Sequence, residues 1–259
     1  MSTVPLPLVV GGCQIPVTLN IQQNLIEIKK AINWAADNGV DIMSTPECSL
    51  SGYLWKPDNS DDPRILEISD AITELAEYST NKKVDLVLGT AQYNALNQWC
   101  DTLQFIINGK IAHIHYKNVM FEHQYTAGTG VHVFEYKGKK IGGLICSDLW
   151  SNPLAYPDAS GKLIRSLQEQ KCEVVFLSAN TPKNISSMWI EWHTICVRMF
   201  GNLANWYTVV ADNTYKMEGF EWEGRTGVNC GIYSNNDTCV KAREHGTDYF
   251  KKTLYDRIY

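Results

Sequence analysis

Near its middle the chain reads Gly142-Gly143-Leu144-Ile145-Cys146-Ser147-Asp148-Leu149-Trp150. The residues before the cysteine continue an apolar run from Lys140 that has the composition of a buried strand. A polar turn follows the cysteine at once. Because open α/β sheets carry their chemistry on the loops after the carboxyl ends of the strands, this stretch predicts an α/β fold with a cysteine nucleophile at a strand end.

The segments on either side of this stretch alternate between strand and helix patterns. Short apolar runs and Gly- or Asn-rich breaks indicate strands, whereas apolar residues three and four positions apart indicate helices. The pair Asn108-Gly109 is a strong signal for a β-hairpin, and Lys137-Gly138-Lys139 joins a second one. Strands are predicted at Leu8–Gln14, Val40–Thr45, Val84–Ala91, Cys100–Ile107, Ile111–Tyr116, Val131–Tyr136, Lys140–Cys146, Val174–Ala179, Tyr207–Asp212 and Gly231–Tyr233, and helices at Ile21–Ala36, Ile65–Thr80, Leu163–Gln170 and Met188–Leu203. The order predicts a mixed sheet covered by helices.

Length and composition limit the other classes. A chain of 259 residues with 44% hydrophobic content is expected to form one domain over residues 1–259, in which Lys241–Tyr259 is a tail outside the core pattern. The 28 acidic and 23 basic residues are interspersed, which argues against nucleic acid as a partner. Met1–Pro7 lacks the features of a signal peptide, and no window approaches the roughly 18 apolar residues of a membrane span. The eight cysteines are scattered without a Cys-x-x-Cys pair, so we expect thiols in a cytoplasmic protein that is not bound to a membrane.

Two further strand ends carry residues that suit a cysteine nucleophile. Glu47 follows the predicted strand Val40–Thr45, and Lys117 follows Ile111–Tyr116. A free thiol with a pKa of about 8.5 is little ionised at neutral pH, so it needs a base or a cation beside it. Glu47 is a candidate base, and Lys117 is a candidate donor to an oxyanion. The backbone N–H of Ser147 would be a second donor, and loss of one such donor typically costs about 3 kcal/mol of transition-state stabilisation. This chemistry requires neither a metal nor an organic cofactor.

Each of these residues also has a structural interpretation. Cys146 alone would be a buried thiol, Glu47 a loop carboxylate and Lys117 a solvated charge. We expect Asp148 to accept hydrogen bonds from nearby backbone N–H groups rather than to contact a substrate. His113 and His115 alternate on one strand, but no recognised ligand spacing accompanies them. They are interpreted as exposed strand histidines rather than as zinc ligands.

Glu, Lys and Cys in this order at three strand ends resemble the nitrilase (carbon–nitrogen hydrolase) superfamily. The resemblance extends from Val9 to about Val240 and is carried by three blocks. It implies a four-layer αββα sandwich, usually paired with a second copy as a homodimer, and cleavage of non-peptide C–N bonds. Relatives carry a second glutamate after the lysine, and Glu122 matches it on a loop that is shorter than expected. The blocks are Gly39–Tyr53, Tyr116-Lys117 and Gly143–Trp150.

The resemblance implies an enzyme that hydrolyses a small-molecule amide through a cysteine thioester, with Glu47, Lys117, Cys146 and Glu122 as catalytic residues. N-carbamoyl hydrolase and nitrilase activities are the alternatives within the superfamily. Outside it, a Cys–His thiol peptidase and a catalytically silent binding module remain. No arginine adjoins the three blocks, so we expect a neutral or cationic amide. Four residues are candidates for contacting it: Tyr53, Ser147, Trp150 and Asn180.

Overall fold

The computed structural model describes residues 7–150, 161–181, 187–214, 230–234, 240–243 and 246–255. Within these ranges helices and strands alternate along the chain, as the sequence pattern predicts. The strands are β1 (Leu8–Ile15), β2 (Ile42–Ser44), β3 (Asp85–Tyr93), β4 (Trp99–Ile107), β5 (Lys110–Tyr116), β6 (Val133–Tyr136), β7 (Lys139–Ile145), β8 (Val174–Ser178), β9 (Tyr207–Asn213), β10 (Gly231–Tyr233), β11 (Val240–Lys241) and β12 (Asp248–Leu254). The α-helices are α1 (Ile21–Asp37), α2 (Pro63–Asn81), α3 (Lys162–Glu169) and α4 (Ser187–Ala204).

The strands form one large mixed sheet with the order β5-β4-β3-β2-β1-β9-β8-β7-β6. Strands β1, β2 and β3 run parallel, as do β7, β8 and β9, while β4, β5 and β6 are antiparallel to their neighbours. Among the described residues, strand pairing joins the two halves where the ends of β1 and β9 meet, at Gln14 with Asp212 and at Ile15 with Asn213. The sheet therefore folds over at this junction.

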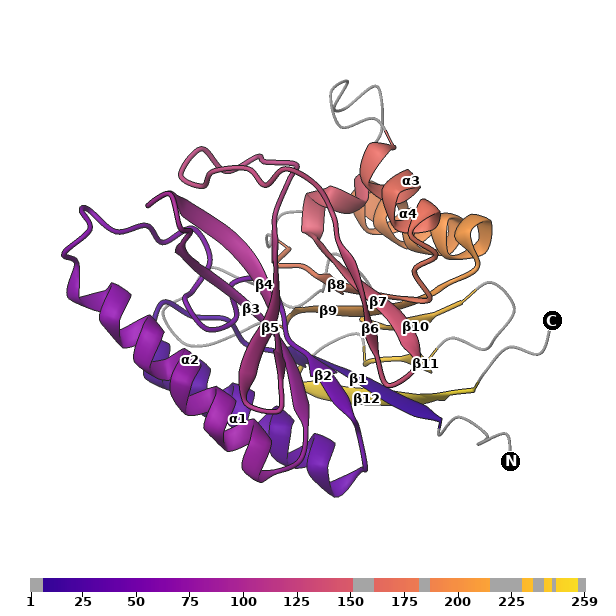
Figure 1. The fold of residues 1–259 in the computed structure, drawn as a ribbon, viewed down its shortest axis with the longest axis horizontal. Coiled ribbons are helices and arrows are strands. Elements are labelled where there is room, and N and C mark those ends of the chain that lie inside the picture. Colours follow the sequence, from indigo (N-terminus) through magenta and orange to yellow (C-terminus); the bar gives the residue numbers. More distant parts are fainter. Residues whose placement is uncertain are drawn as a thin grey trace.

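Apolar side chains divide the molecule into layers. One cluster packs α1 and α2 against the half of the sheet that contains β1 to β4, and a second packs α3 and α4 against β7, β8 and β9. A third cluster lies between the two halves. In it the rings of Phe105 of β4 and Phe176 of β8 pack edge to face, with their centroids 6.0 Å apart. Figure 1 shows the two helical layers on opposite outer sides of the strands. The predicted four-layer αββα sandwich is confirmed.

The hairpin between β4 and β5 has the predicted turn but an unpredicted irregularity. Asn108 and Gly109 both have positive φ, 49° and 74°, as a two-residue turn of this kind requires. A bulge between Phe105 and Ile106 then shifts the register, so that Thr102 pairs with Tyr116. The backbone N–H of Lys117 donates to the carbonyl of Asp101 at 3.0 Å. The bulge thus brings Lys117 and Asp101 opposite one another.

The end of the chain differs from the expectation that Lys241–Tyr259 lies outside the core. Asp248–Leu254 forms β12, which pairs with the whole of β1 in antiparallel register. Phe250 and Leu254 are buried in the cluster between the two halves of the sheet. The other five residues of β12, two lysines among them, are partly or fully exposed, which explains why the segment reads as a polar tail. No helix in the described parts of the chain is long and apolar enough to span a bilayer.

Candidate active site

Glu47 is held in a turn that contacts both halves of the sheet. It follows β2, and its backbone N–H donates to the carbonyl of Ala179, just after β8, at 3.2 Å. The side-chain amide of Asn180 donates to the carbonyl of Glu47 at 3.1 Å. Gly89 of β3 lies directly beneath this turn, and a Cβ there would come within 2.0 Å of the Pro46 carbonyl oxygen. The Glu47 side chain is fully buried.

Lys117 lies at the end of β5 and its ammonium group contacts three carboxyl groups. Its Nζ atom is 2.6 Å from Oε1 of Glu47, 2.8 Å from Oε1 of Glu122 and 3.7 Å from Oδ2 of Asp101. The side chains of Lys117, Glu47 and Asp101 are fully buried, and that of Glu122 is nearly so. Two predicted catalytic carboxylates therefore share one buried cation, although they are 75 residues apart in the printed sequence.

Cys146 begins a short 3₁₀ helix, Cys146–Trp150, directly after β7. Its φ of 43° lies in the left-handed region that a residue with a side chain seldom adopts, and such strain is common at functional sites. The residue keeps partial contact with solvent. Burial is the largest cause of the raised pKa of its thiol; the charge of Glu47 raises it further, while that of Lys117 lowers it. The thiol is thus electrostatically connected to both partners that the sequence predicts.

Asp148 ties the cysteine turn to the loop that follows Lys117. Its Oδ1 atom accepts from the backbone N–H groups of Asn118 and Val119 at 2.8 and 2.9 Å, and its Oδ2 accepts from that of Ile145 at 3.1 Å. The prediction that Asp148 binds local backbone N–H groups is confirmed. Nε2 of His115 lies 2.9 Å from Oδ2.

His115 is buried, so its interpretation as an exposed strand residue is wrong. The reason is that β5 packs over β7 inside the sandwich, where the carboxylate of Asp148 supplies a hydrogen-bond partner. In the described parts of the chain no group of His, Cys, Asp and Glu side chains is arranged to hold a metal ion.

The four predicted substrate contacts lie around this cluster in different ways. The Tyr53 hydroxyl donates to Oε1 of Glu122 at 2.5 Å. Ser147 is buried and its hydroxyl donates to the carbonyl of Val119. Trp150 stacks on His193 with ring centroids 4.7 Å apart. Asn180 is buried, with its side chain turned toward the Glu47 backbone and toward Asn213, whose amide donates to it.

The charges of the cluster act in opposite directions on its members. Burial raises the pKa of Glu47 well above its usual range, and the charges of Asp101 and Glu122 raise it further. Lys117 lowers it, but not enough to offset these effects. For Glu122 burial also raises the pKa, but Lys117 and the hydrogen bond from Tyr53 outweigh it, and the net pKa is lowered. Burial alone would lower the pKa of Lys117, yet Glu47, Cys146, Asp101 and Glu122 together raise it well above its usual range. The site therefore combines an ammonium, one carboxyl group with a lowered pKa (Glu122) and two with a raised pKa (Glu47 and Asp101).

Asp101 is the charged residue of the site that the sequence reasoning missed. It lies on β4, fully buried, and its Oδ1 accepts from the thiol of Cys48 at 3.5 Å. One signal was present in the sequence, because an aspartate interrupts the apolar strand Cys100–Ile107 on the same hairpin as Lys117. An ionisable group in such a strand needs a partner, and Lys117 provides it.

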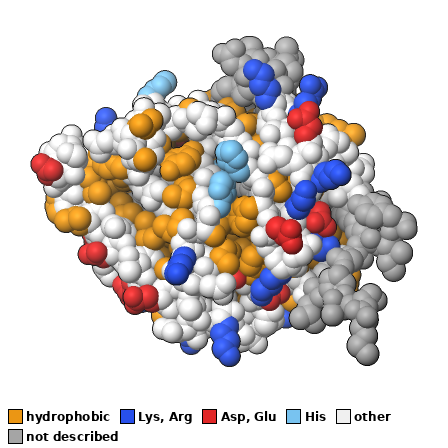
Figure 2. Space-filling model, viewed as in Figure 1, with side chains coloured by type: hydrophobic (Ala, Val, Ile, Leu, Met, Phe, Trp, Pro, Cys, Tyr) orange, Lys and Arg blue, Asp and Glu red, His pale blue; other side chains and the backbone are white. Residues whose placement is uncertain are grey.

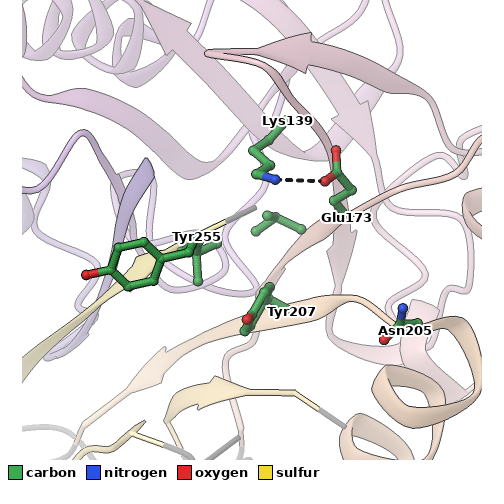
Figure 3. Close-up of a pocket in the computed structure, with 7 residues that line it drawn as sticks. Lys139, Glu173, Asn205, Tyr207 and Tyr255 are labelled. Atoms are coloured by element: carbon green, nitrogen blue, oxygen red, sulfur yellow. Dashed lines mark hydrogen bonds and ion pairs between the residues drawn. The ribbon is translucent and has the colours of Figure 1, made fainter. Parts of the chain in front are cut away.

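A cavity elsewhere in the fold does not involve these residues. Figure 3 shows it lined by Lys139, Glu173, Asn205, Tyr207 and Tyr255, with an ion pair of 3.0 Å between Lys139 and Glu173. It lies at the amino ends of β7, β8 and β9, whereas Cys146 follows the carboxyl end of β7. The chemistry-bearing side chains are therefore at the opposite end of the strands.

The fold and this set of residues are accompanied by a match to a known family. The model of the carbon–nitrogen hydrolase family matches residues 9–226. The chain belongs to the carbon–nitrogen hydrolase family. The predicted resemblance is thereby confirmed, and the buried pair of Glu47 and Lys117 fits the family's catalytic triad. No curated protein matches this carbon–nitrogen hydrolase in sequence.

Solved structures share the fold of this carbon–nitrogen hydrolase at low sequence identity. An amidase from Nesterenkonia sp. is 15% identical with a TM-score of 0.77, over 96% of this chain and 90% of that one. A variant of the Nesterenkonia sp. AN1 amidase, with acrylamide added to its active-site cysteine, is 14% identical with a TM-score of 0.75, over 94% and 92% of the two chains. The glutamine-dependent NAD+ synthetase from Acinetobacter baumannii, in complex with ADP, is 18% identical with a TM-score of 0.76. The match covers 95% of this chain but only 45% of the length of the synthetase.

Proposed function

We propose that this carbon–nitrogen hydrolase cleaves the C–N bond of a small-molecule amide through a thioester on Cys146. The observation that carries the proposal is the buried ammonium of Lys117 between Glu47 and Glu122, with the thiol of Cys146 under the influence of all three. Burying such a cluster is costly, because each charge loses its hydration. A cluster of this kind at strand ends is therefore a strong indication of catalysis.

The proposed reaction moves one proton at a time. The sulfur of Cys146 attacks the amide carbon while its proton passes to the carboxylate of Glu47, and the carbonyl oxygen becomes an oxyanion. Lys117 and the backbone N–H of Ser147 donate to that oxyanion. Glu47 then protonates the departing ammonia or amine as the C–N bond breaks, which leaves the thioester. Water, deprotonated by Glu47, attacks the thioester, and the released thiolate of Cys146 recovers its proton.

Glu122 and Tyr53 support this cycle in the proposal. Glu122 is ionised, because its pKa is lowered by Lys117, and it holds the ammonium from the side opposite Glu47. The Tyr53 hydroxyl fixes the Glu122 carboxylate through its 2.5 Å hydrogen bond. Trp150 is proposed as an apolar wall of the substrate site, and Asn180 as a support for the Glu47 turn.

The charge of the cluster supports a neutral or cationic substrate. Three carboxyl groups surround the single ammonium of Lys117, so a substrate carboxylate would meet repulsion. The amidase from Nesterenkonia sp. supports a small amide, because acrylamide reaches its active-site cysteine. An N-carbamoyl amine and a nitrile are the two alternatives that use the same residues.

Incubation with a panel of amides, carbamoyl amines and nitriles is expected to release ammonia fastest from uncharged or cationic primary amides. The reason is that Glu47 protonates a departing amine well, whereas a nitrile offers no leaving group at the first step. Ammonia release is measured for each compound at equal concentration, with the matched carboxylate-bearing amide as the control. Turnover of nitriles alone would contradict the amidase proposal.

A Cys–His thiol peptidase has less support. The charged groups that act most strongly on the Cys146 thiol are Glu47, Lys117, Glu122 and Asp212, and no histidine is among them. Two buried histidines contact the turn Cys146–Trp150, and each is engaged elsewhere than with the thiol: His115 with Asp148 and His193 with the ring of Trp150. A silent binding module would not require a buried lysine between two carboxylates.

We also propose that the protein forms a homodimer through α4. Five large apolar side chains on this helix are exposed at spacings of three and four residues, which places them on one face. The other side of the helix, with His193 and Val197, is buried. The stripe is apolar and is flanked by one acidic and one basic exposed residue, Glu191 and Arg198, so it is self-complementary, and a second copy related by a two-fold axis is the occupant that fits it. The stripe consists of Met188, Trp192, Ile195, Met199 and Leu203.

Replacing Ile195 by glutamate is expected to convert the dimer into a monomer, because the substitution puts an unpaired charge into the centre of the apolar contact. Light scattering coupled to size exclusion measures the mass of both proteins at micromolar concentration. Ile26→Glu on α1 is the matched control, since Ile26 is similarly exposed, at 54% against 57%, on the opposite helical layer. A wild-type monomer, or a dimer that survives Ile195→Glu, would rule out this interface.

A further inference from the structure

Two buried carboxyl oxygens at the site have no hydrogen-bond donor among the described residues. They are Oε2 of Glu47 and Oδ2 of Asp101. The second oxygen of each group is satisfied, because Oε1 of Glu47 accepts from Lys117 at 2.6 Å and Oδ1 of Asp101 accepts from Cys48 at 3.5 Å. A buried polar atom without a partner typically costs about 1–3 kcal/mol, and more when it is charged. Two such atoms in one cluster call for a common explanation.

The two carboxyl groups are neighbours around one cation, because Nζ of Lys117 lies 2.6 Å from Oε1 of Glu47 and 3.7 Å from Oδ2 of Asp101. Burial raises the pKa of both groups and Lys117 lowers it in both; Asp101 raises the pKa of Glu47 further, whereas Glu47 lowers that of Asp101 as a hydrogen-bond donor would. Ionised carboxylates only accept hydrogen bonds, so a bond between two of them requires one proton. The directions of the two shifts correspond to a proton carried by Glu47 and accepted by Asp101.

The charges around the pair favour such a proton. Asp101 is faced by Glu47, Lys117 and Glu122 and by the thiol of Cys48, and Glu47 is faced by Lys117, Asp101 and Glu122. Three ionised carboxylates against one ammonium would leave a net charge of −2 on side chains that are almost fully buried, and one added proton reduces it to −1. Like charges in contact bind a proton more tightly than either would alone.

We propose that Asp101 is a positioning residue that shares one proton with Glu47 and thereby sets the lower pH limit at which Glu47 is free to act as a base. The inference rests on the proposed function for its effect on turnover, but the shared proton does not depend on it. As the pH rises, the proton leaves the pair for solvent, and the Glu47 carboxylate can accept the proton of Cys146. Once protonated, Glu47 again donates to Asp101, which stabilises the acid form until the departing amine takes the proton.

The shared proton is tested by infrared titration of the wild-type protein and of the isosteric variant Asp101→Asn. The wild type is expected to show a carboxylic-acid C=O band near neutral pH, where a lone glutamate with a pKa of about 4.3 would be ionised. Glu47→Gln is expected to remove the band. In Asp101→Asn the side-chain amide donates to Glu47 and favours its ionised form, so the band should disappear about 1 to 3 pH units lower.

The same variant should move the acidic limb of kcat/KM to lower pH by an equal amount, because that limb reports the base of the free enzyme. Asp85→Asn is the matched control: Asp85 begins β3 at the other end of the sheet, and its replacement should leave the limb in place. The proposal would be overturned if Asp101→Asn left unchanged both the acidic limb of kcat/KM and the pH midpoint of the infrared band. The proposal would also be overturned if the wild type near neutral pH showed no carboxylic-acid band that Glu47→Gln removes. This comparison of the wild type with Glu47→Gln decides the matter if Asp101→Asn does not fold. If no amide is turned over, the infrared titration still tests Asp101 while the proposed function fails.

Discussion

The Cys146→Ala variant is expected to lose amide turnover by roughly 10⁴-fold or more while retaining its fold, because no other group in the proposed cycle can form the thioester. Fold retention is expected since the residue keeps partial contact with solvent and its side chain is small. Ammonia release under saturating substrate measures the loss, and thermal unfolding verifies the fold.

Cys172→Ala is the control for this variant. Cys172 is a buried thiol just before β8, at the end of the strands opposite to Cys146, so its replacement should leave turnover close to that of the wild type. If Cys146→Ala retained more than about 1% of wild-type turnover, the thioester pathway would be untenable.

The Lys117→Ala variant is expected to lose both turnover and stability. Removal of an oxyanion donor typically lowers kcat by about 10²- to 10³-fold, and a buried ion pair that loses one partner typically costs about 3–5 kcal/mol of unfolding free energy. The variant leaves Glu47, Glu122 and Asp101 in mutual contact without a cation. Because Lys117 lowers the pKa of Glu47, the acidic limb of the remaining activity should also move to higher pH.

Lys110→Ala is the matched control, since Lys110 is exposed at the far end of the same strand, β5. Denaturant titration and ammonia release are measured on both variants. A Cys–His enzyme would remain largely active without Lys117, so near-normal turnover of Lys117→Ala would favour the peptidase alternative.

The fold was predictable because its strands are defined by local patterns. Apolar runs bounded by breaks marked the strands β1 to β10, and Asn108-Gly109 marked the β4–β5 hairpin. The segment Asp248–Leu254 was missed because only two of its seven residues, Phe250 and Leu254, are buried, and its partner β1 lies 234 to 246 positions earlier in the sequence. Local patterns do not report such pairing when one face of a strand is polar.

The site was predictable where its residues stand at strand ends and not where they lie within strands. Glu47, Lys117 and Glu122 meet as expected, since parallel strands deliver their carboxyl ends to one edge. Asp101 was missed because a regular two-residue hairpin would set it opposite Tyr116. The bulge at Phe105 and Ile106 moves it opposite Lys117 instead, and a shift of one residue changes which side chains share a face.

The central claim is that Cys146, Lys117 and Glu47 act as one chemical unit, and cysteine alkylation tests it most directly. Wild type and Lys117→Ala are treated with substoichiometric iodoacetamide at neutral pH, and the modified peptides are mapped by mass spectrometry over time. Among the described cysteines Cys146 is the one that keeps partial contact with solvent, so wild-type Cys146 should be alkylated ahead of the others. Burial and Glu47 raise the pKa of its thiol and Lys117 lowers it, so alkylation should be about tenfold or more slower in Lys117→Ala. Labelling of Cys146 no faster than the other cysteines, or at the same rate without Lys117, would contradict the account.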